Sequence, residues 1–170
     1  TLTLTQHQSE AVDYLEKALE GRQPGPKSVL LHGVTGSGKT EVYLRALEGC
    51  VARGRKGILL VPEISLTPQM VHQVNQRFPG RVAVMHSGLT LRTQFDWWWR
   101  MREGGYDVVV GPRSALFSPL PQVGLIVVDE EHEWTYKSVE VAPLYHARDV
   151  ALKLGRELDV PVLMGSATPD

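Results

Sequence analysis

The chain has 170 residues, of which 42% are hydrophobic, and 18 Lys and Arg against 19 Asp and Glu give it a formal charge of −1. This length and composition suit one domain with its own hydrophobic core and leave no room for a second domain of similar size. The near-zero charge excludes a global basic field that would attract nucleic acid, so any such binding must come from local loops. The single Cys50 excludes an internal disulfide and a cysteine-cluster metal site, which fits a reducing compartment.

Two further classes of protein are disfavoured by the sequence. No apolar stretch approaches the length of a membrane span, and residues 1–5 lack the charged and apolar regions of a signal peptide. His7, His32, His72 and His86 show no metal-ligand spacing with a carboxylate. We therefore expect a soluble, cytoplasmic protein with no membrane partner and no zinc site.

Strand-like runs alternate with helix-like runs along the chain, which is the pattern of a parallel sheet covered by helices. Residues 5–20 place apolar side chains on one helical face, and the Gly and Pro residues of 21–26 end that helix. The predicted strands are 28–32, 57–61, 81–86, 106–110, 123–128 and 160–164. The predicted helices after the first are 39–53, 67–78, 90–103 and 146–157. The fold class is therefore predicted to be α/β, with a mostly parallel central sheet and helices on both faces.

A glycine-rich loop joins the first predicted strand to the second helix. It reads Gly33-Val34-Thr35-Gly36-Ser37-Gly38-Lys39-Thr40. The glycines let the backbone turn around a polyphosphate so that N–H groups at a helix N-terminus point at its oxygens. Lys39 adds a positive charge for the terminal phosphates, and the Thr40 hydroxyl is placed to ligate Mg²⁺. The alternative is a glycine turn that merely connects a strand to a helix.

An acidic cluster, Asp129-Glu130-Glu131-His132, follows a β-branched run typical of a strand buried on both faces. Asp129 can hold Mg²⁺ through its water shell, while Glu130 can orient and deprotonate the water that attacks a γ-phosphate. A solvated turn is the alternative interpretation. Because ligands of open α/β sheets bind beyond the carboxyl ends of the strands, we expect this cluster and the glycine loop to face one crevice.

Other predicted strands also end in distinctive segments. These are Pro62-Glu63-Ile64-Ser65-Leu66-Thr67-Pro68-Gln69, His86-Ser87-Gly88-Leu89, Gly111-Pro112-Arg113-Ser114-Ala115-Leu116-Phe117 and Gly165-Ser166-Ala167-Thr168-Pro169. A further segment, Tyr145-His146-Ala147-Arg148-Asp149, lies at the start of the last predicted helix. Together with the glycine loop and the acidic cluster, their order resembles the motifs of the first RecA-like domain of superfamily 2 helicases. Their residues are similar to those of the bacterial primosomal helicases that restart stalled replication forks.

The resemblance implies roles for individual residues. It implies that the phosphates of single-stranded DNA contact Ser65, Thr67, Arg113 and Ser114, and that the ATP state is linked to domain motion by His132, Ser166 and Thr168. Hydroxyl groups and backbone N–H groups at strand ends can hold a phosphate chain without recognising bases. Alternatively, Ser65 and Thr67 cap the helix at 67–78, and Arg113 is a surface ion-pair partner.

Gln8 and Trp134 carry two further hypotheses from the resemblance. The Gln8 amide would recognise adenine, since it can donate and accept a hydrogen bond at once. Thr5 and Gln8 also satisfy the capping-box pattern, which is the alternative. Trp134 lies where the family has an aromatic-rich loop that senses DNA. Its neighbours Glu133 and Thr135 depart from the small polar residues expected there.

The three consecutive residues Trp97, Trp98 and Trp99 cannot form one stacking platform for bases, because successive helical side chains point about 100° apart. We instead predict a core stripe on that helix. It consists of Leu91, Phe95, Trp98 and Met101.

The resemblance also indicates what the whole enzyme would do. It implies ATP and Mg²⁺ as cofactors, 3′ to 5′ movement on single-stranded or forked DNA, and primosome and single-strand-binding proteins as partners in the bacterial, nucleoid-associated cytoplasm. We expect residues 1–170 to form a single RecA-like P-loop domain without the second motor domain, and hence to be poorly active alone. The alternatives are a nucleotide-gated DNA-binding switch and, less favoured, a small-molecule P-loop kinase.

Overall fold

The computed structural model describes residues 6–20, 28–33, 37–86, 88–129 and 146–167 of the chain. The helices in this part are α1 (Gln6–Leu19), α2 (Ser37–Ala52), α3 (Pro68–Arg77), α4 (Leu91–Arg102) and α5 (His146–Leu158), with short 3₁₀ helices η1 (Glu63–Ser65) and η2 (Arg113–Phe117). The strands are β1 (Ser28–Gly33), β2 (Lys56–Leu60), β3 (Val82–Val84), β4 (Val108–Gly111), β5 (Val123–Asp129) and β6 (Val162–Ala167).

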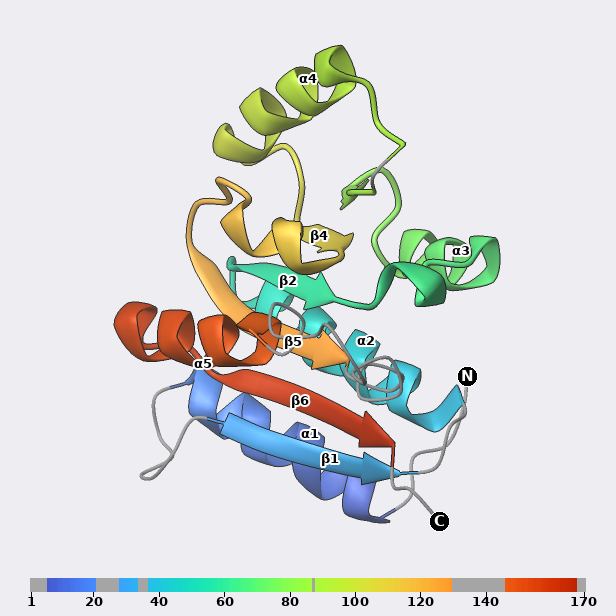
Figure 1. Cartoon of the computed structure of the whole chain (residues 1–170). Coiled ribbons are helices and arrows are strands. Elements are labelled where there is room, and N and C mark those ends of the chain that lie inside the picture. Colours follow the sequence, from blue (N-terminus) through green and yellow to red (C-terminus); the bar gives the residue numbers. More distant parts are fainter. Residues whose placement is uncertain (1–5, 21–27, 34–36, 87, 130–145, 168–170) are drawn as a thin grey trace.

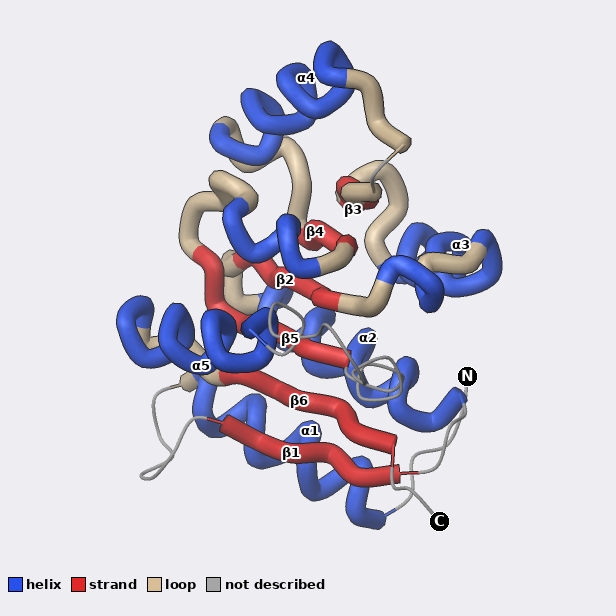
Figure 2. The backbone as a smooth tube through the Cα atoms, in the orientation of Figure 1, coloured by secondary structure: helices blue, strands red, loops and turns tan. Residues whose placement is uncertain are grey.

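The strands form one six-stranded sheet in the order β1-β6-β5-β2-β4-β3, and every pair of neighbours is parallel (Figures 1 and 2). β6 lies between β1 and β5, so that Gly33 at the end of β1 pairs with Ala167 and Asp129 at the end of β5 pairs with Gly165. Because the strands are parallel, their carboxyl ends meet at one edge of the sheet.

Each face of the sheet has its own hydrophobic core, since successive strand residues point to opposite sides. In β5, Leu125 and Val127 belong to one core, while Ile126 and Val128 belong to the other. The first core is covered by α1, α2 and α3, and the second by α4, α5 and η2. Figure 1 shows α5 in front of the sheet and α1 and α2 behind it. The predicted α/β class, with a parallel sheet and helices on both faces, is confirmed.

Element boundaries differ from the predicted ones by a few residues. α2 begins at Ser37, two residues before the predicted start, and β6 runs to Ala167 rather than to Met164. The two short 3₁₀ helices at Glu63–Ser65 and Arg113–Phe117 were not predicted, because a single turn leaves no periodic pattern in the sequence. None of the described helices is long and apolar enough to span a membrane.

The predicted core stripe of α4 is wrong for three of its four residues. Leu91, Phe95 and Trp98 are 83%, 62% and 39% exposed. Figure 1 shows the reason, since α4 lies beyond the β3 edge of the sheet and its N-terminal half extends away from the body of the domain. A helix that contacts the core at one end only does not bury its whole apolar stripe.

The part of α4 that does reach the core is its C-terminal half, where Trp97 rather than Trp98 packs beside Met101. Met101 is 1% exposed, and the Trp97 ring packs edge-to-face on Tyr106 with the ring centroids 6.3 Å apart. Trp98 and Trp99 also lie edge-to-face, with centroids 5.1 Å apart. This perpendicular arrangement agrees with the prediction that the three tryptophans form no common stacking platform.

Cys50 is a buried free thiol in α2. Its Sγ atom lies 3.4 Å from the carbonyl oxygen of Lys56, to which the thiol donates a weak hydrogen bond. Burial raises the pKa of this thiol to about 11, so it remains protonated and unreactive at neutral pH.

A cluster of charges holds the amino-terminal ends of β2 and β4 together. Lys56 Nζ donates to Asp107 Oδ1 over 2.8 Å, and Arg81 donates to both carboxylate oxygens over 3.1 and 3.0 Å. The hydrogen bonds from Arg81 and Lys56 hold the pKa of Asp107 below its usual value, although burial acts in the opposite direction. The cluster thus fixes the connections at the edge of the sheet that is remote from the glycine loop.

We predict that Asp107→Asn lowers the free energy of unfolding by about 1 kcal/mol at pH 7, because it removes a charge-assisted, partly exposed contact. The folded pKa is lower than the ordinary value of 3.8, so the stabilisation is complete above that pH and is lost as the pH falls through the folded pKa. Urea unfolding between pH 7 and pH 3 should show the two proteins converging at the acid end. The exposed Glu103→Gln is the control, and a pH-independent difference would contradict this account.

Candidate nucleotide-binding site

The described part of the glycine loop lies where β1 meets α2. Gly33 is the last residue of β1, and α2 begins four positions later at Ser37. Lys39 lies in the first turn of α2 and is only 4% exposed, while Thr40 is half-buried. The first N–H groups of this helix have no intrahelical partners and can bind an anion. Three loop residues lie outside the described part of the chain: Val34, Thr35 and Gly36.

Gln8 of α1 lies against this loop. A Cβ atom built on Gly38 would be 2.6 Å from Gln8 Nε2, so the amide of Gln8 occupies the space that a side chain at position 38 would need. A side chain at position 38 would therefore displace the Gln8 amide from the loop. The close approach also places the amide beside the phosphate loop, although adenine recognition by Gln8 stays a prediction. Thr5, its partner in the alternative capping box, lies outside the described residues.

Asp129 contacts the helix that follows the glycine loop. Tyr43 of α2 is 1% exposed, and its hydroxyl donates a hydrogen bond to Asp129 Oδ1 over 3.2 Å. Asp129 ends β5, and its neighbour in β6 is Gly165. The hydrogen bond therefore ties the first acidic residue to the same helix that carries Lys39 and Thr40. The arrangement brings a buried ammonium, a hydroxyl and a carboxylate to one edge of the sheet.

Gly165 provides the space for this contact. A Cβ atom at this position would lie 1.6 Å from the Tyr43 hydroxyl oxygen and 2.7 Å from its ring carbon Cζ. The Tyr43 ring thus passes directly over the backbone of β6 to reach Asp129. Neither Tyr43 nor Gly165 was predicted to have a role at this site. A signal for Tyr43 existed, because it lies one helical turn after Lys39 and so on the same face of the helix.

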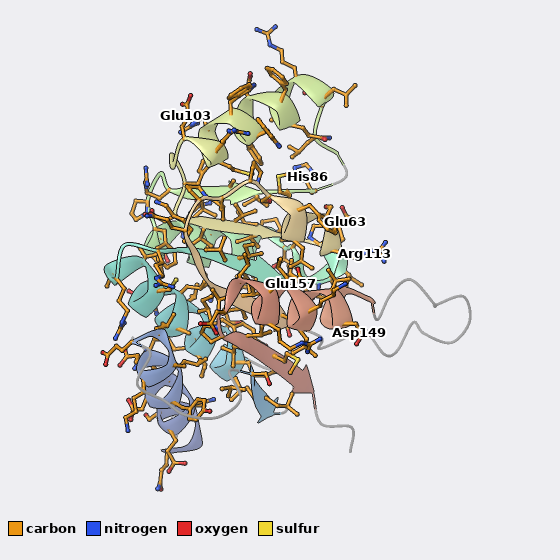
Figure 3. All side chains as sticks on the ribbon, turned by 90° about the vertical axis from the view of Figure 1, so that its left-hand side faces the viewer. Glu63, His86, Glu103, Arg113, Asp149 and Glu157 are labelled. Carbon is orange, nitrogen blue, oxygen red and sulfur yellow. The ribbon has the colours of Figure 1, made fainter. Side chains whose placement is uncertain are left out.

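The residues with predicted DNA contacts lie at the carboxyl ends of β2 and β4. Ser65 ends η1, while Arg113 and Ser114 are exposed and begin η2. The backbone N–H of Val61 donates to the carbonyl of Gly111 over 2.9 Å, which joins the two strand ends. Figure 3 shows Glu63 of η1 and Arg113 of η2 on the same side of the molecule.

Thr67 has a structural role in addition to the predicted one. It is the N-cap of α3, and its hydroxyl oxygen accepts a hydrogen bond from the backbone N–H of Met70 over 3.2 Å. The capping alternative therefore describes an interaction that exists. The cap orients the same hydroxyl group that the DNA hypothesis uses, and contact with DNA stays a prediction.

Several predicted site residues lie outside the described part of the chain. They are Glu130, His132, Trp134 and Thr168. Ser166 belongs to β6, where its backbone pairs with His32, but its side chain is not described. The hydrolytic, coupling and DNA-sensing roles of these five residues stay predictions.

The DEAD/DEAH box helicase family matches residues 5–170. The replication restart protein PriA of Bacillus subtilis is 48% identical over 168 residues, which cover 99% of this chain and 20% of that protein. The PriA protein of Treponema pallidum is 46% identical over 169 residues, which cover 99% of this chain and 25% of that protein. The chain thus spans a fifth to a quarter of the length of these relatives.

Solved structures support the fold. A structure of RecG bound to a three-way DNA junction matches 99% of this chain and 21% of that chain, with a TM-score of 0.71 and 24% identity. A hypothetical ATP-dependent RNA helicase from Sulfolobus tokodaii also matches 99% of this chain and 47% of that chain, with a TM-score of 0.65 and 18% identity. At these identities the similarity establishes the architecture alone.

The parallel sheet with a glycine loop at the end of β1 defines a RecA-like P-loop domain, the class that binds nucleotides together with a divalent metal ion. The chain belongs to the DEAD/DEAH box helicase family. Its similarity to the replication restart proteins over nearly all of its length confirms the resemblance to primosomal helicases that the motifs indicate.

We predict that Gly165→Ala destabilises the domain by about 1–3 kcal/mol, because the new methyl group must displace the Tyr43 ring. In the double variant with Tyr43→Phe, the hydroxyl that causes the closest contact is gone. The double variant should therefore be more stable than the sum of the single changes predicts, by at least about 0.5 kcal/mol. Chemical denaturation of the four proteins measures this coupling.

Gly49→Ala is the matched control. It adds a methyl group within α2 that would approach only the flexible ends of Arg53 and Glu16, at 3.4 and 3.5 Å. This change should leave stability equal or higher, since alanine favours a helix. Strict additivity of the Gly165 and Tyr43 changes would show that the two residues do not meet as described.

Proposed function

We propose that this chain is the nucleotide-binding half of the motor of an ATP-dependent DNA helicase that acts in replication restart. The observation that carries the proposal is the hydrogen bond between Tyr43 and Asp129. It joins α2, the helix after the glycine loop, to the end of β5, where the acidic cluster begins. The names of the PriA relatives, which the chain matches over nearly its whole length, support the role in replication restart.

The side chains at this edge fit a magnesium nucleotide. Lys39 is a buried cation in the first turn of α2, where it would neutralise phosphate charge. Thr40 and Asp129 supply the hard oxygen ligands that Mg²⁺ prefers. Gln8 lies against the phosphate loop, where its amide could reach the base of the nucleotide. The metal would stabilise negative charge on the phosphates during hydrolysis.

The protein residues would divide the chemical work between them. Glu130 would accept a proton from the attacking water, and Lys39 would stabilise charge that develops on the terminal phosphate. His132, Ser166 and Thr168 would transmit the state of this site to a second motor domain.

The proposed DNA path crosses the carboxyl ends of β2 and β4. Ser65 and Thr67 border one strand end, and Arg113 and Ser114 border the other. These exposed or half-buried polar side chains suit contacts to phosphates rather than to bases. Trp134 would add an aromatic contact that senses the bound strand.

The complete enzyme would need more than this chain. Superfamily 2 helicases complete the γ-phosphate site with arginines from a second RecA-like domain, and we propose that this chain works with such a domain on single-stranded or forked DNA. Primosome and single-strand-binding proteins would be its partners in the bacterial cytoplasm. A nucleotide-gated switch that binds DNA without processive movement is the alternative function.

Two substitutions in the full-length protein separate the motor from the switch. Lys39→Ala should abolish nucleotide-dependent function whether the protein is a motor or a switch. Glu130→Gln should reduce ATP hydrolysis by at least about 100-fold, because it removes the general base, while leaving nucleotide binding intact. A motor then loses unwinding in both variants, whereas a switch retains nucleotide-dependent DNA binding with Glu130→Gln.

Steady-state ATPase, strand-displacement and DNA-binding assays give these readouts. Lys153→Ala, which removes an exposed lysine from α5, is the matched control and should behave as wild type. If Lys39→Ala hydrolysed ATP at the wild-type rate, the assignment of the glycine loop as the nucleotide site would be wrong.

The isolated 170-residue chain should hydrolyse ATP about 10³- to 10⁵-fold more slowly than the two-domain protein, because the arginine contribution is missing. Single-turnover hydrolysis, measured for both proteins with and without single-stranded DNA, checks this expectation. Robust DNA-stimulated turnover by the isolated chain would contradict the proposed division of the active site.

A further inference from the structure

Glu41, which directly follows Thr40 in the phosphate loop, is anchored by an arginine from another helix. Arg77 at the end of α3 donates from Nη2 to both Glu41 carboxylate oxygens, over 2.6 Å each. Arg45 of α2 donates from Nε to Glu41 Oε2 over 2.7 Å. The Glu41 side chain is only 8% exposed, so this carboxylate is largely removed from water.

The contact between Glu41 and Arg77 keeps both side chains charged. Burial acts to raise the pKa of Glu41, but the hydrogen bonds from Arg77 and Arg45 outweigh it and the net pKa is lowered. The hydrogen bond to Glu41 raises the pKa of Arg77 in turn. A buried pair of this kind contributes little to stability compared with apolar packing, whereas loss of one partner leaves the other charge uncompensated. The pair therefore matters less for stability than for the fixed position in which it holds Glu41 relative to Arg77.

α3 connects this contact to the proposed DNA path. α3 has ten residues, so it is a rigid rod of about 15 Å. Its first end is capped by Thr67 and follows directly on η1, the segment of the proposed DNA path. Its last residue is Arg77, which contacts Glu41, the residue that follows Thr40 near the start of α2. One rod thus joins the proposed DNA contact to the phosphate loop.

We infer that Arg77 and Glu41 are positioning residues through which DNA binding at η1 and Thr67 alters the affinity of the phosphate loop for nucleotide. The inference rests on the proposed function. A shift of α3 on DNA binding would move the Arg77 guanidinium, and the hydrogen bonds from its Nη2 to both Glu41 carboxylate oxygens would transmit this movement to the start of α2. By linkage, nucleotide binding alters DNA affinity by the same factor.

The experiment measures this coupling in the full-length protein. The dissociation constant of MANT-ATP, a fluorescent ATP analogue, is determined with Mg²⁺ in the absence of DNA and at saturating oligothymidylate. The ratio of the two constants is the coupling factor, which for allosteric systems is typically about 5- to 150-fold.

Arg77→Gln should bring the coupling factor close to one, while the affinity for MANT-ATP without DNA changes by less than about twofold. Glu41→Gln should act in the same direction, because it weakens the contact from the other side. Arg77→Lys keeps the charge but replaces the planar guanidinium with a freely rotating ammonium group, which holds Glu41 less rigidly, so it should restore only part of the coupling. Thermal unfolding confirms which variants are folded, and Arg77→Lys and Glu41→Gln decide the question if Arg77→Gln is not.

Glu48→Gln is the matched control. Glu48 accepts a hydrogen bond from Arg77 Nη1 over 2.5 Å, but its side chain is 47% exposed and it lies two turns further along α2. Loss of this solvent-exposed partner should leave the coupling factor at its wild-type value. The comparison separates the buried contact with Glu41 from a general effect of removing charge around Arg77.

The outcomes distinguish this inference from the proposed function. If wild type binds neither MANT-ATP nor oligothymidylate, the proposed function itself fails. If wild type shows coupling and the folded Arg77 and Glu41 variants retain it in full, the inference alone is overturned. It is also overturned if those variants lose MANT-ATP affinity equally with and without DNA, since the pair would then only support the structure of the loop.

Discussion

The adjacency of three parallel strands, β1, β6 and β5, is the constraint on which the rest of the site depends. It brings the end of β1, where the glycine loop begins, and the end of β5, where the acidic cluster begins, to one edge of the sheet. Only β6 separates them. β6 must lack a side chain at one position, because the Tyr43 ring crosses its backbone there to reach Asp129. Gly165 satisfies this requirement, so a residue with no functional group of its own determines whether two chemical motifs can meet.

Two arginine–carboxylate clusters organise the domain from different places. Asp107 binds Arg81 and Lys56 at the amino-terminal edge of the sheet, where it joins strand connections that take no part in the proposed chemistry. Glu41 binds Arg77 and Arg45 beside the phosphate loop. Both carboxylates have lowered pKa values because cations hold them charged. The same type of contact therefore stabilises architecture in one place and, in our proposal, relates two binding segments in the other.

α4 carries large aromatic side chains that this domain does not bury. Its exposed Trp99 packs edge-to-face on both Phe95 and Trp98, which are also exposed, outside the main core. Of the apolar side chains of α4, Trp97 and Met101 join the core of the domain. The apolar period of a helix shows that it has an apolar side, but the length of sheet available to that helix determines how much of the side is buried.

The sequence by itself determined the α/β class, the order of the main helices and strands, and the position of the glycine loop and of Asp129 at the ends of two strands. These features depend on local patterns, namely apolar period, glycine spacing and carboxylates at a strand end, which short segments contain in full. Only the tertiary structure decided that β6 lies between β1 and β5, that Tyr43 meets Asp129 from 86 positions away, and that Arg77 meets Glu41 from 36 positions away. Such pairs leave no periodic signal, because the contacts exist only once the sheet and its helices have packed.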